Sequence, residues 1–159
     1  FNPGRFLAYD PFISPVDAAA LTVELVSLEE VFRGSDFVAV NCPLTDETRG
    51  MIDGRLFSLM KPMAYFVNTA RGGIVNQGDL IDALRAKRIA GAGLDVYEAE
   101  PLPADSPLIG LDNVILAPHA LAWTDDLYRD NGLGACRWNL SLDKGESVKL
   151  TYKWHYYWR

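Results

Sequence analysis

The sequence predicts an α/β protein with a doubly wound parallel sheet. Short apolar runs rich in β-formers alternate with segments of helical periodicity along the chain. Several of these runs are followed directly by polar residues, as in Tyr65-Phe66-Val67, which leads into Asn68. Central strands of a parallel sheet are apolar because both of their faces are covered, and ligands bind where they end.

The composition is that of an ordinary globular protein. The 159 residues are 49% hydrophobic and 23% charged, and the net charge is -6. This acidic balance argues against a nucleic-acid partner, and no stretch approaches the ~20 apolar residues of a membrane span. Cys42 and Cys136 are the only cysteines. They are too few for a disulfide framework, so a reducing, cytoplasmic location is expected.

The expected strands are short apolar runs that end at Gly, Pro, Asn or Asp, or at the start of a helix. They lie at residues 6–9, 23–26, 36–40, 63–68, 91–97 and 113–117. Helices are expected at residues 28–32, 48–59, 77–88 and about 125–141. The first is preceded by Ser27 and contains Glu30, the spacing of a capping box. This order of elements predicts a Rossmann-like sheet.

The carboxyl ends of parallel strands meet at one edge of such a sheet, so residues distant in sequence gather there. The polar residues expected at this edge are Asp10, Cys42-Pro43, Asn68 to Arg71, Asp95 and Pro118-His119. Arg71 is followed by Gly72 and Gly73, which let the backbone turn sharply after the strand. An arginine in this place is expected to meet a ligand.

Three segments carry a resemblance to a known family. They are CPLTDETRGMI, VNTARGGIVNQGDLIDALRAKRIAGAGLDVYEAEPLP and NVILAPHALAWTDDLYRDNG, in this order. Together they resemble the D-isomer-specific 2-hydroxyacid dehydrogenases over roughly residues 5 to 146. The resemblance implies an oxidoreductase that transfers a hydride between NAD(H) and a D-2-hydroxy acid/2-oxo acid pair. It also implies a small-molecule substrate and a homodimer.

By this resemblance, Arg71 binds the substrate, His119 is the acid/base, and Glu100 is the carboxylate beside it. The chemistry of these residue types agrees. An arginine fork binds a carboxylate in a bidentate manner, and histidine exchanges protons near neutral pH. A carboxylate next to the histidine stabilises the imidazolium. In the oxidation direction, His119 takes the hydroxyl proton as the hydride leaves.

Each assignment has a structural alternative. Arg71 could pair with a surface acid at a strand end, and His119 could be a structural histidine. Glu98 is a rival to Glu100 in the same acidic loop, but Glu100 stands directly before Pro101, as the family's glutamate does.

Cofactor contacts are implied mainly by the same resemblance. Asp10 matches the acid that accepts hydrogen bonds from the adenosine ribose, and a carboxylate there favours NAD over NADP; the alternative is an Asp-Pro turn. The other expected contacts are Cys42, Pro43, Thr69, Ala70, Arg71, Asp95, His119, Ala120, Leu121 and Ala122. Leu121 stands where the family often has glycine. No metal ligands are predicted.

The Gly-rich turn G-x-G-x-x-G is absent from the sequence. The chain also lacks an initiator Met, so it is expected to begin inside a longer protein, and the fold to be truncated at its N-terminus. The strands that end at Asp10 and Val26 are then expected to lose their neighbour. Weak NAD binding and little turnover are expected of the isolated chain.

The last residues depart from the family pattern. From Val148 to Trp158, apolar or aromatic residues alternate with Lys, Thr, His, Tyr and finally Arg. This period of two predicts a strand with one aromatic face. Residues 1–146 are therefore expected to form a partial NAD-binding domain, and 147–159 a tail outside it. A non-catalytic nucleotide-sensing or interaction module, or an inert fragment, is the alternative to a dehydrogenase.

Overall fold

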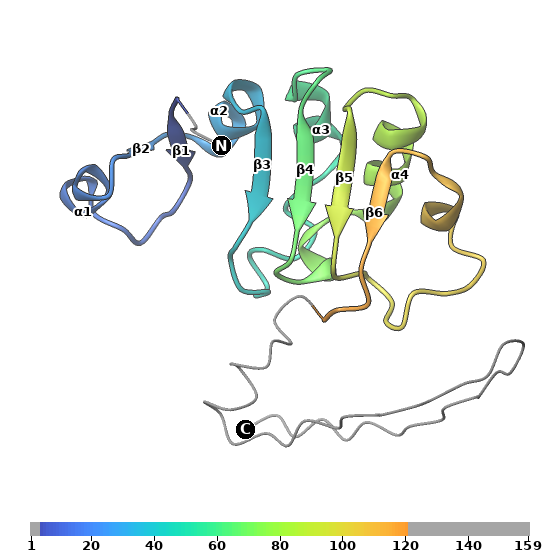
Figure 1. Cartoon of the computed structure of the whole chain (residues 1–159). Coiled ribbons are helices and arrows are strands. Elements are labelled where there is room, and N and C mark those ends of the chain that lie inside the picture. The colour runs from blue at the N-terminus through green and yellow to red at the C-terminus, as the bar shows by residue number, and fades with distance from the viewer. Residues whose placement is uncertain (1–3, 121–159) are drawn as a thin grey trace, which may run out of the picture. The chain divides into compact units, whose positions relative to one another are not determined.

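The fold is known from a computed structural model, which describes residues 4–120 (Figure 1). Its strands are β1 (Phe6–Ala8), β2 (Val23–Leu25), β3 (Phe37–Val40), β4 (Tyr65–Asn68), β5 (Gly91–Leu94) and β6 (Val114–Leu116). Its helices are α1 (Pro15–Ala20), α2 (Leu28–Gly34), α3 (Gly54–Leu59) and α4 (Gln77–Arg85), with short 3₁₀ turns η1 (Gly72–Ile74) and η2 (Pro107–Gly110). The expected helix at 125–141 and the tail at 147–159 lie outside the described residues.

The strands are parallel, as the sequence predicts, and they form two sheets. One has the order β3-β4-β5-β6, with Val40 opposite Asn68 and Asn68 opposite Leu94. The other is the pair β1-β2. Together with the flanking helices, this is a Rossmann-like arrangement. All four strands of the larger sheet end at the same edge, at the bottom of Figure 1.

The expected loss of strand pairing is found at one of the two places named and is wrong at the other. The strand that ends near Val26 keeps a neighbour, because β2 pairs with β1. Within residues 4–120, β1 and β3 are not paired with each other, so each has an edge without a partner strand, as the outer strands β2 and β6 also do. The reason is the Rossmann strand order 3-2-1-4-5-6, numbered for the general fold. In that order the first strand lies between the second and the fourth, whose places β1 and β3 take here.

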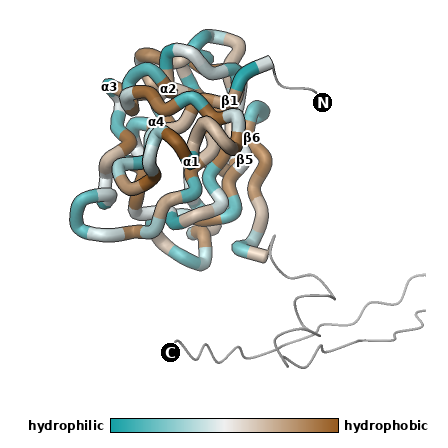
Figure 2. Tube along the Cα trace, turned by 90° about the vertical axis from the view of Figure 1, so that its left-hand side faces the viewer, coloured by the Kyte–Doolittle hydropathy of each residue, from teal (hydrophilic) through white to brown (hydrophobic). Residues whose placement is uncertain are grey.

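The core lies between the larger sheet and helices α2, α3 and α4, which cover one face of it (Figure 1). Alternate residues of β3 and β4 are buried on that face, Val38 and Val40 in β3 and Phe66 in β4. Phe57 of α3 contacts Phe66 edge to face. On the other face the rings of Phe37 and Tyr65 stack, and both are exposed. Figure 2 shows the hydrophobic stretches along the same chain.

Two helices follow the sequence prediction closely. Ser27 and Glu30 form the expected capping box at the start of α2. Helix α4 begins after Asn76, whose side chain accepts a hydrogen bond from the Asp79 amide. It ends at Arg85, three residues before the predicted end.

One helical prediction is wrong at its start, and one helix was not predicted. The helix expected at 48–59 begins only at Gly54, because the Asp53 side chain accepts from the Leu56 amide and caps it there. Ile52, just before this cap, bridges to Val75 in an extended conformation. Helix α1 was not predicted, although Ser14 caps it and Pro15 occupies its first turn.

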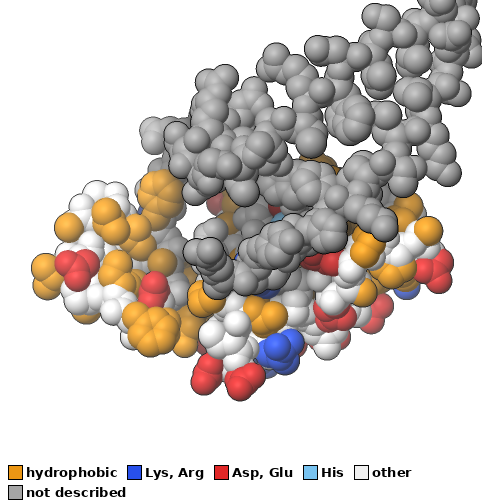
Figure 3. Space-filling view, turned by 90° about the horizontal axis from the view of Figure 1, so that it is seen from below, with side chains coloured by type: hydrophobic (Ala, Val, Ile, Leu, Met, Phe, Trp, Pro, Cys, Tyr) orange, Lys and Arg blue, Asp and Glu red, His pale blue; other side chains and the backbone are white. Residues whose placement is uncertain are grey.

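No helix in the described part of the chain is long and apolar enough to cross a membrane. Several hydrophobic side chains are exposed on the β1–α1–β2 segment, where they gather at the left of Figure 3. They belong to Phe6, Tyr9, Phe12, Val16 and Leu21.

Candidate active site

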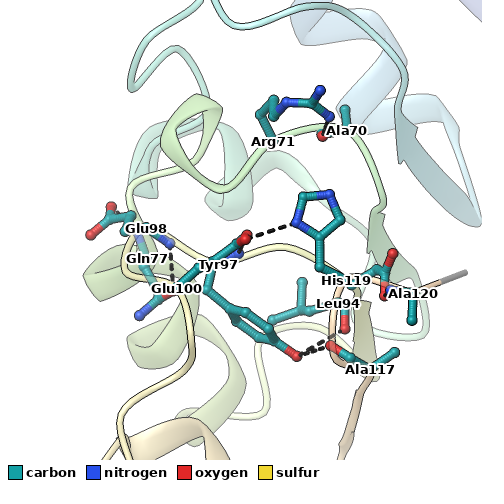
Figure 4. A network of polar contacts seen from close by, with 11 residues as sticks. Ala70, Arg71, Gln77, Leu94, Tyr97, Glu98, Glu100, Ala117, His119 and Ala120 are labelled. Atoms are coloured by element: carbon teal, nitrogen blue, oxygen red, sulfur yellow. Dashed lines mark hydrogen bonds and ion pairs between the residues drawn. The ribbon is translucent and has the colours of Figure 1, made fainter. Parts of the chain in front are cut away.

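The candidate site lies at the edge where β4, β5 and β6 end. The loop after β4 carries Arg71, the loop after β5 carries Glu100, and the turn after β6 carries His119. Figure 4 shows the three side chains on one side of the strand ends, with the imidazole between Glu100 and the Arg71 loop. Residues that are 48 positions apart in sequence are thus brought together by the parallel topology.

Glu100 and His119 form a close pair. Glu100 Oε2 lies 2.7 Å from His119 Nδ1, and the two side chains are 36% and 39% exposed. The Tyr97 amide donates to the other carboxylate oxygen, Oε1, at 3.0 Å. A carboxylate held in this way fixes the proton on Nδ1, so Nε2 is the ring nitrogen turned away from Glu100.

Glu98, the rival carboxylate, has different partners. Its Oε1 accepts from the Gln77 amide at 2.8 Å, and its own amide donates to the Gln77 side chain at 3.3 Å. Gln77 is the first residue of α4, so Glu98 satisfies an amide at a helix N-terminus. The structure therefore separates the two carboxylates: Glu98 faces α4 and Glu100 faces His119.

Tyr97 ties the ends of β5 and β6 together. Its hydroxyl donates to the Ala117 carbonyl at 2.7 Å and lies 3.2 Å from the Leu94 carbonyl. The side chain is buried, and this burial raises the pKa of the phenol above its ordinary value of 10.0. The hydroxyl therefore remains a donor at neutral pH.

The turn that presents His119 has an unusual backbone. His119 has φ of 56°, in the left-handed region. The amide that follows it, that of Ala120, donates to Asp95 Oδ1 at 2.9 Å. Asp95 is only 4% exposed. Its carboxylate thus holds the backbone of the turn.

Arg71 is exposed at the carboxyl end of β4, and its Nη1 donates to the Ala70 carbonyl at 2.6 Å. Thr69 and Ala70 lie in the same loop. Cys42 and Pro43 follow β3 at the same edge, and burial raises the pKa of the half-buried Cys42 thiol above its ordinary value of 9.0.

Asp10 lies apart from this group, after β1 in the smaller sheet. Its Oδ1 accepts from the Phe12 amide at 2.8 Å, which is the Asp-Pro turn considered as the alternative. The side chain is exposed, so the turn leaves the carboxylate at the surface.

Leu121 and Ala122 lie outside the described residues. Residues 4–120 contain no cluster of three or more His, Cys, Asp or Glu side chains that could hold a metal ion.

Sequence reasoning placed Asn68 at this edge and Gly72 in the turn after the strand, but it missed the contacts that these two residues and Tyr97 make there. A signal existed for Asn68, because an amide directly after a buried strand must find hydrogen-bond partners. The role of Gly72 depends on a tertiary contact with Tyr97 and Glu98, which no local pattern reveals.

This geometry defines a Rossmann-like α/β domain with a carboxylate–imidazole pair at the strand ends, and comparison with known proteins identifies its family. The model of the D-isomer specific 2-hydroxyacid dehydrogenase NAD binding domain matches residues 4–120. The chain belongs to this family.

Individual relatives agree with the family assignment. The chain is 41% identical to a D-3-phosphoglycerate dehydrogenase of Archaeoglobus fulgidus over 143 residues, which are 90% of this chain and 27% of that protein. It is 49% identical to a glyoxylate reductase of Korarchaeum cryptofilum over 116 residues, 73% of this chain and 35% of that one. A solved D-lactate dehydrogenase with NAD⁺ from Lactobacillus jensenii superposes with a TM-score of 0.71 at 30% identity, covering 79% of this chain and 41% of that chain. The chain thus spans about a quarter to two fifths of the length of these relatives.

Proposed function

We propose that this chain is the NAD-binding part of a dehydrogenase that interconverts a 2-oxo acid and a D-2-hydroxy acid. The observation that carries the proposal is the 2.7 Å contact between Glu100 and His119 at the edge that also bears Arg71. A proton donor and a cation on the same edge are what the reduction of a 2-oxo acid requires.

The proposed roles follow from the contacts of each side chain. Glu100 holds the imidazole through Nδ1, so Nε2 is the atom that gives a proton to the carbonyl oxygen, or takes one from the hydroxyl group. The carboxylate also stabilises the imidazolium that forms in the oxidation direction. Arg71 supplies a fixed positive charge and up to five N–H donors for the substrate carboxylate and carbonyl.

The residues present fit a nicotinamide dinucleotide. Ala70, which has a small side chain, and the half-buried Cys42 lie at the same edge of the sheet as His119. The exposed Asp10 carboxylate can accept hydrogen bonds from ribose hydroxyls. When bound, NADH supplies the hydride that reduces the carbonyl carbon. We propose Thr69, Asp95, Ala120, Leu121 and Ala122 as further residues on the nicotinamide side.

The test uses the full chain with NADH and glyoxylate, and with NAD⁺ and D-3-phosphoglycerate, followed at the NADH absorbance. We expect slow turnover, which His119→Ala lowers further by about 10²- to 10⁴-fold because the proton donor is lost. Arg71→Ala is expected to raise KM for the acid and lower kcat. The Arg88→Ala variant, at an exposed arginine beyond α4, is the matched control and should behave as the parent chain.

The alternative, a nucleotide-binding module without turnover, gives a different result in this assay. NADH would bind, as seen by quenching of tryptophan fluorescence, but neither acid would change its absorbance. Absence of both binding and turnover would contradict both proposals.

We also propose that the protein acts as a homodimer in the cytoplasm. The exposed hydrophobic side chains on the β1–α1–β2 segment support association, because exposed apolar patches mark interaction surfaces. The low cysteine count supports a reducing compartment. Sedimentation velocity over a range of concentrations tests the dimer, and Phe12→Ser, at a residue 95% exposed, should weaken it.

A further inference from the structure

Asn68 is one of two buried polar or charged side chains in residues 4–120, the other being Asp95. It is the last residue of β4 and is 1% exposed. Burying an amide without hydrogen bonds is unfavourable, so the partners of this side chain indicate why it is there.

Both partners of the Asn68 amide belong to the backbone of the Arg71 loop. Its Oδ1 accepts from the Ala70 amide at 3.0 Å, and its Nδ2 donates to the Arg71 carbonyl at 3.0 Å. Its main-chain carbonyl accepts from the Asp95 amide and stays in the sheet. The side chain therefore fastens the loop directly to the end of a buried strand.

The same loop is held from its other side by Gly72. A Cβ at this position would lie 1.9 Å from the Tyr97 carbonyl carbon and 2.6 Å from the Glu98 nitrogen. The backbone after Arg71 thus touches the segment that leads to Glu100 and whose Tyr97 amide holds that carboxylate. A shift of the Arg71 loop would move it against the Glu100 loop.

We infer that Asn68 is a positioning residue for Arg71. By fixing the Ala70 amide before Arg71 and the carbonyl of Arg71 itself, it sets the direction from which the guanidinium reaches a substrate carboxylate. The inference rests on the proposed function and extends it to a residue that touches neither substrate nor cofactor. A purely structural role would instead change stability without a selective effect on the acid.

The experiment compares Asn68→Asp with Asn113→Asp in the full chain. Asn113 is the matched control because its Nδ2 also donates to a backbone carbonyl, that of Leu84, and it stands before β6, away from the site. In Asn68→Asp the donor toward the Arg71 carbonyl is lost. We expect KM for glyoxylate to rise roughly tenfold and KM for NADH to stay within about twofold, with Asn113→Asp like the parent chain in both.

A second readout does not depend on turnover. Oxamate, an unreactive analogue of a 2-oxo acid, is titrated while the Arg71 Nε–H signal is followed by NMR. Asn68→Asp should need roughly tenfold more oxamate for the same shift. Oxamate binding without turnover would overturn the dehydrogenase proposal and leave this inference standing.

The inference is wrong if Asn68→Asp and Asn113→Asp change KM for glyoxylate and oxamate binding equally. It is also wrong if KM for NADH rises as much as KM for glyoxylate, or if oxamate leaves the Arg71 signal of the parent chain unmoved. Should Asn68→Asp fail to fold, Asn68→Ser replaces it, since a hydroxyl can still accept from the Ala70 amide. The same criteria then apply.

Discussion

At the scale of single residues, Glu98 and Glu100 show how two carboxylates two positions apart acquire different surroundings. Glu98 accepts from an amide at the start of α4, whereas Glu100 lies between the Tyr97 amide and His119. Only Glu100 can influence proton transfer at the imidazole, because it is the carboxylate in contact with His119. Position before Pro101 favoured Glu100 in the sequence, and the contacts supply the physical distinction.

This distinction predicts opposite outcomes for one chemical change. Glu100→Gln keeps the shape but removes the charge beside the imidazole, so kcat should fall by about 10- to 100-fold. Glu98→Gln retains an oxygen that can accept from the Gln77 amide, and kcat should stay within about twofold. Steady-state kinetics with glyoxylate and NADH measure both. Equal losses in the two variants would contradict the assignment.

Cys42 provides a probe of the cofactor site. Because burial raises the pKa of its thiol, less thiolate is present at pH 8 than in an unfolded chain, and iodoacetamide should react slowly. NADH should slow the reaction further if Cys42 lines the nicotinamide side. The experiment uses a Cys136→Ser chain, with mass spectrometry as the readout. Unchanged alkylation in the presence of bound NADH would exclude Cys42 from the site.

At the scale of elements, α2 depends on its N-terminal capping box. The Ser27 hydrogen bonds lower the pKa of Glu30 below its ordinary value of 4.5, because they stabilise the carboxylate. A lowered pKa in the folded state contributes stability above the ordinary value, and this is lost as the pH falls through the lowered value.

Ser27→Ala should therefore destabilise the chain by about 1 kcal/mol at pH 7. The loss should shrink as the pH falls through the lowered pKa of Glu30, below which the carboxyl is protonated in both variants. Urea unfolding at pH 7 and pH 3 measures this difference. Ser58→Ala, at an exposed serine inside α3, is the control and should cost less than about 0.5 kcal/mol at either pH. A penalty independent of pH would contradict the capping argument.

The elements also show which parts of the fold a sequence can predict. Every strand was placed to within a few residues, because a short apolar run between turn residues is typical of a strand in an α/β protein. The error at α3 arose because apolar spacing alone extended the helix back to Thr48. Asp53 decides its start, and a cap signal inside a periodic segment is easily overlooked.

The site was predictable only in part. Topology and residue chemistry place Arg71 and His119 at one edge, since the order of strands fixes where their ends meet. The supports of the site were not predictable in the same way. Asn68 and Gly72 act through backbone contacts that depend on how two loops pack, and such contacts leave no periodic trace in the sequence.

At the scale of the whole molecule, the described part is held by two sheets of unequal strength. The larger sheet has four strands and a helix-covered face, whereas β1 and β2 are three residues long and mostly exposed or half-buried. Local stability follows buried contacts and protected hydrogen bonds. The β1–α1–β2 segment is therefore expected to open more readily than the rest.

Hydrogen exchange tests this expectation. The Val26 amide, bonded to the Ala8 carbonyl, should exchange at least about tenfold faster than the Asp95 amide, bonded to the Asn68 carbonyl. Added NADH should slow exchange at Val26 if Asp10 contacts the cofactor. Asp10→Ala should remove this protection while leaving exchange at Asp95 unchanged. Equal rates at the two amides would contradict the difference between the sheets.

The separation of the two sheets also affects how a long ligand is held. A molecule that reaches from Asp10 to the Arg71 loop would act as a tie between parts that no strand joins within residues 4–120. Its apparent dissociation constant is then the intrinsic one divided by the fraction of chains in which both parts are already aligned, so binding is weaker when that fraction is small. Any change that stiffens this alignment should tighten nucleotide retention without altering a single atom that the nucleotide touches.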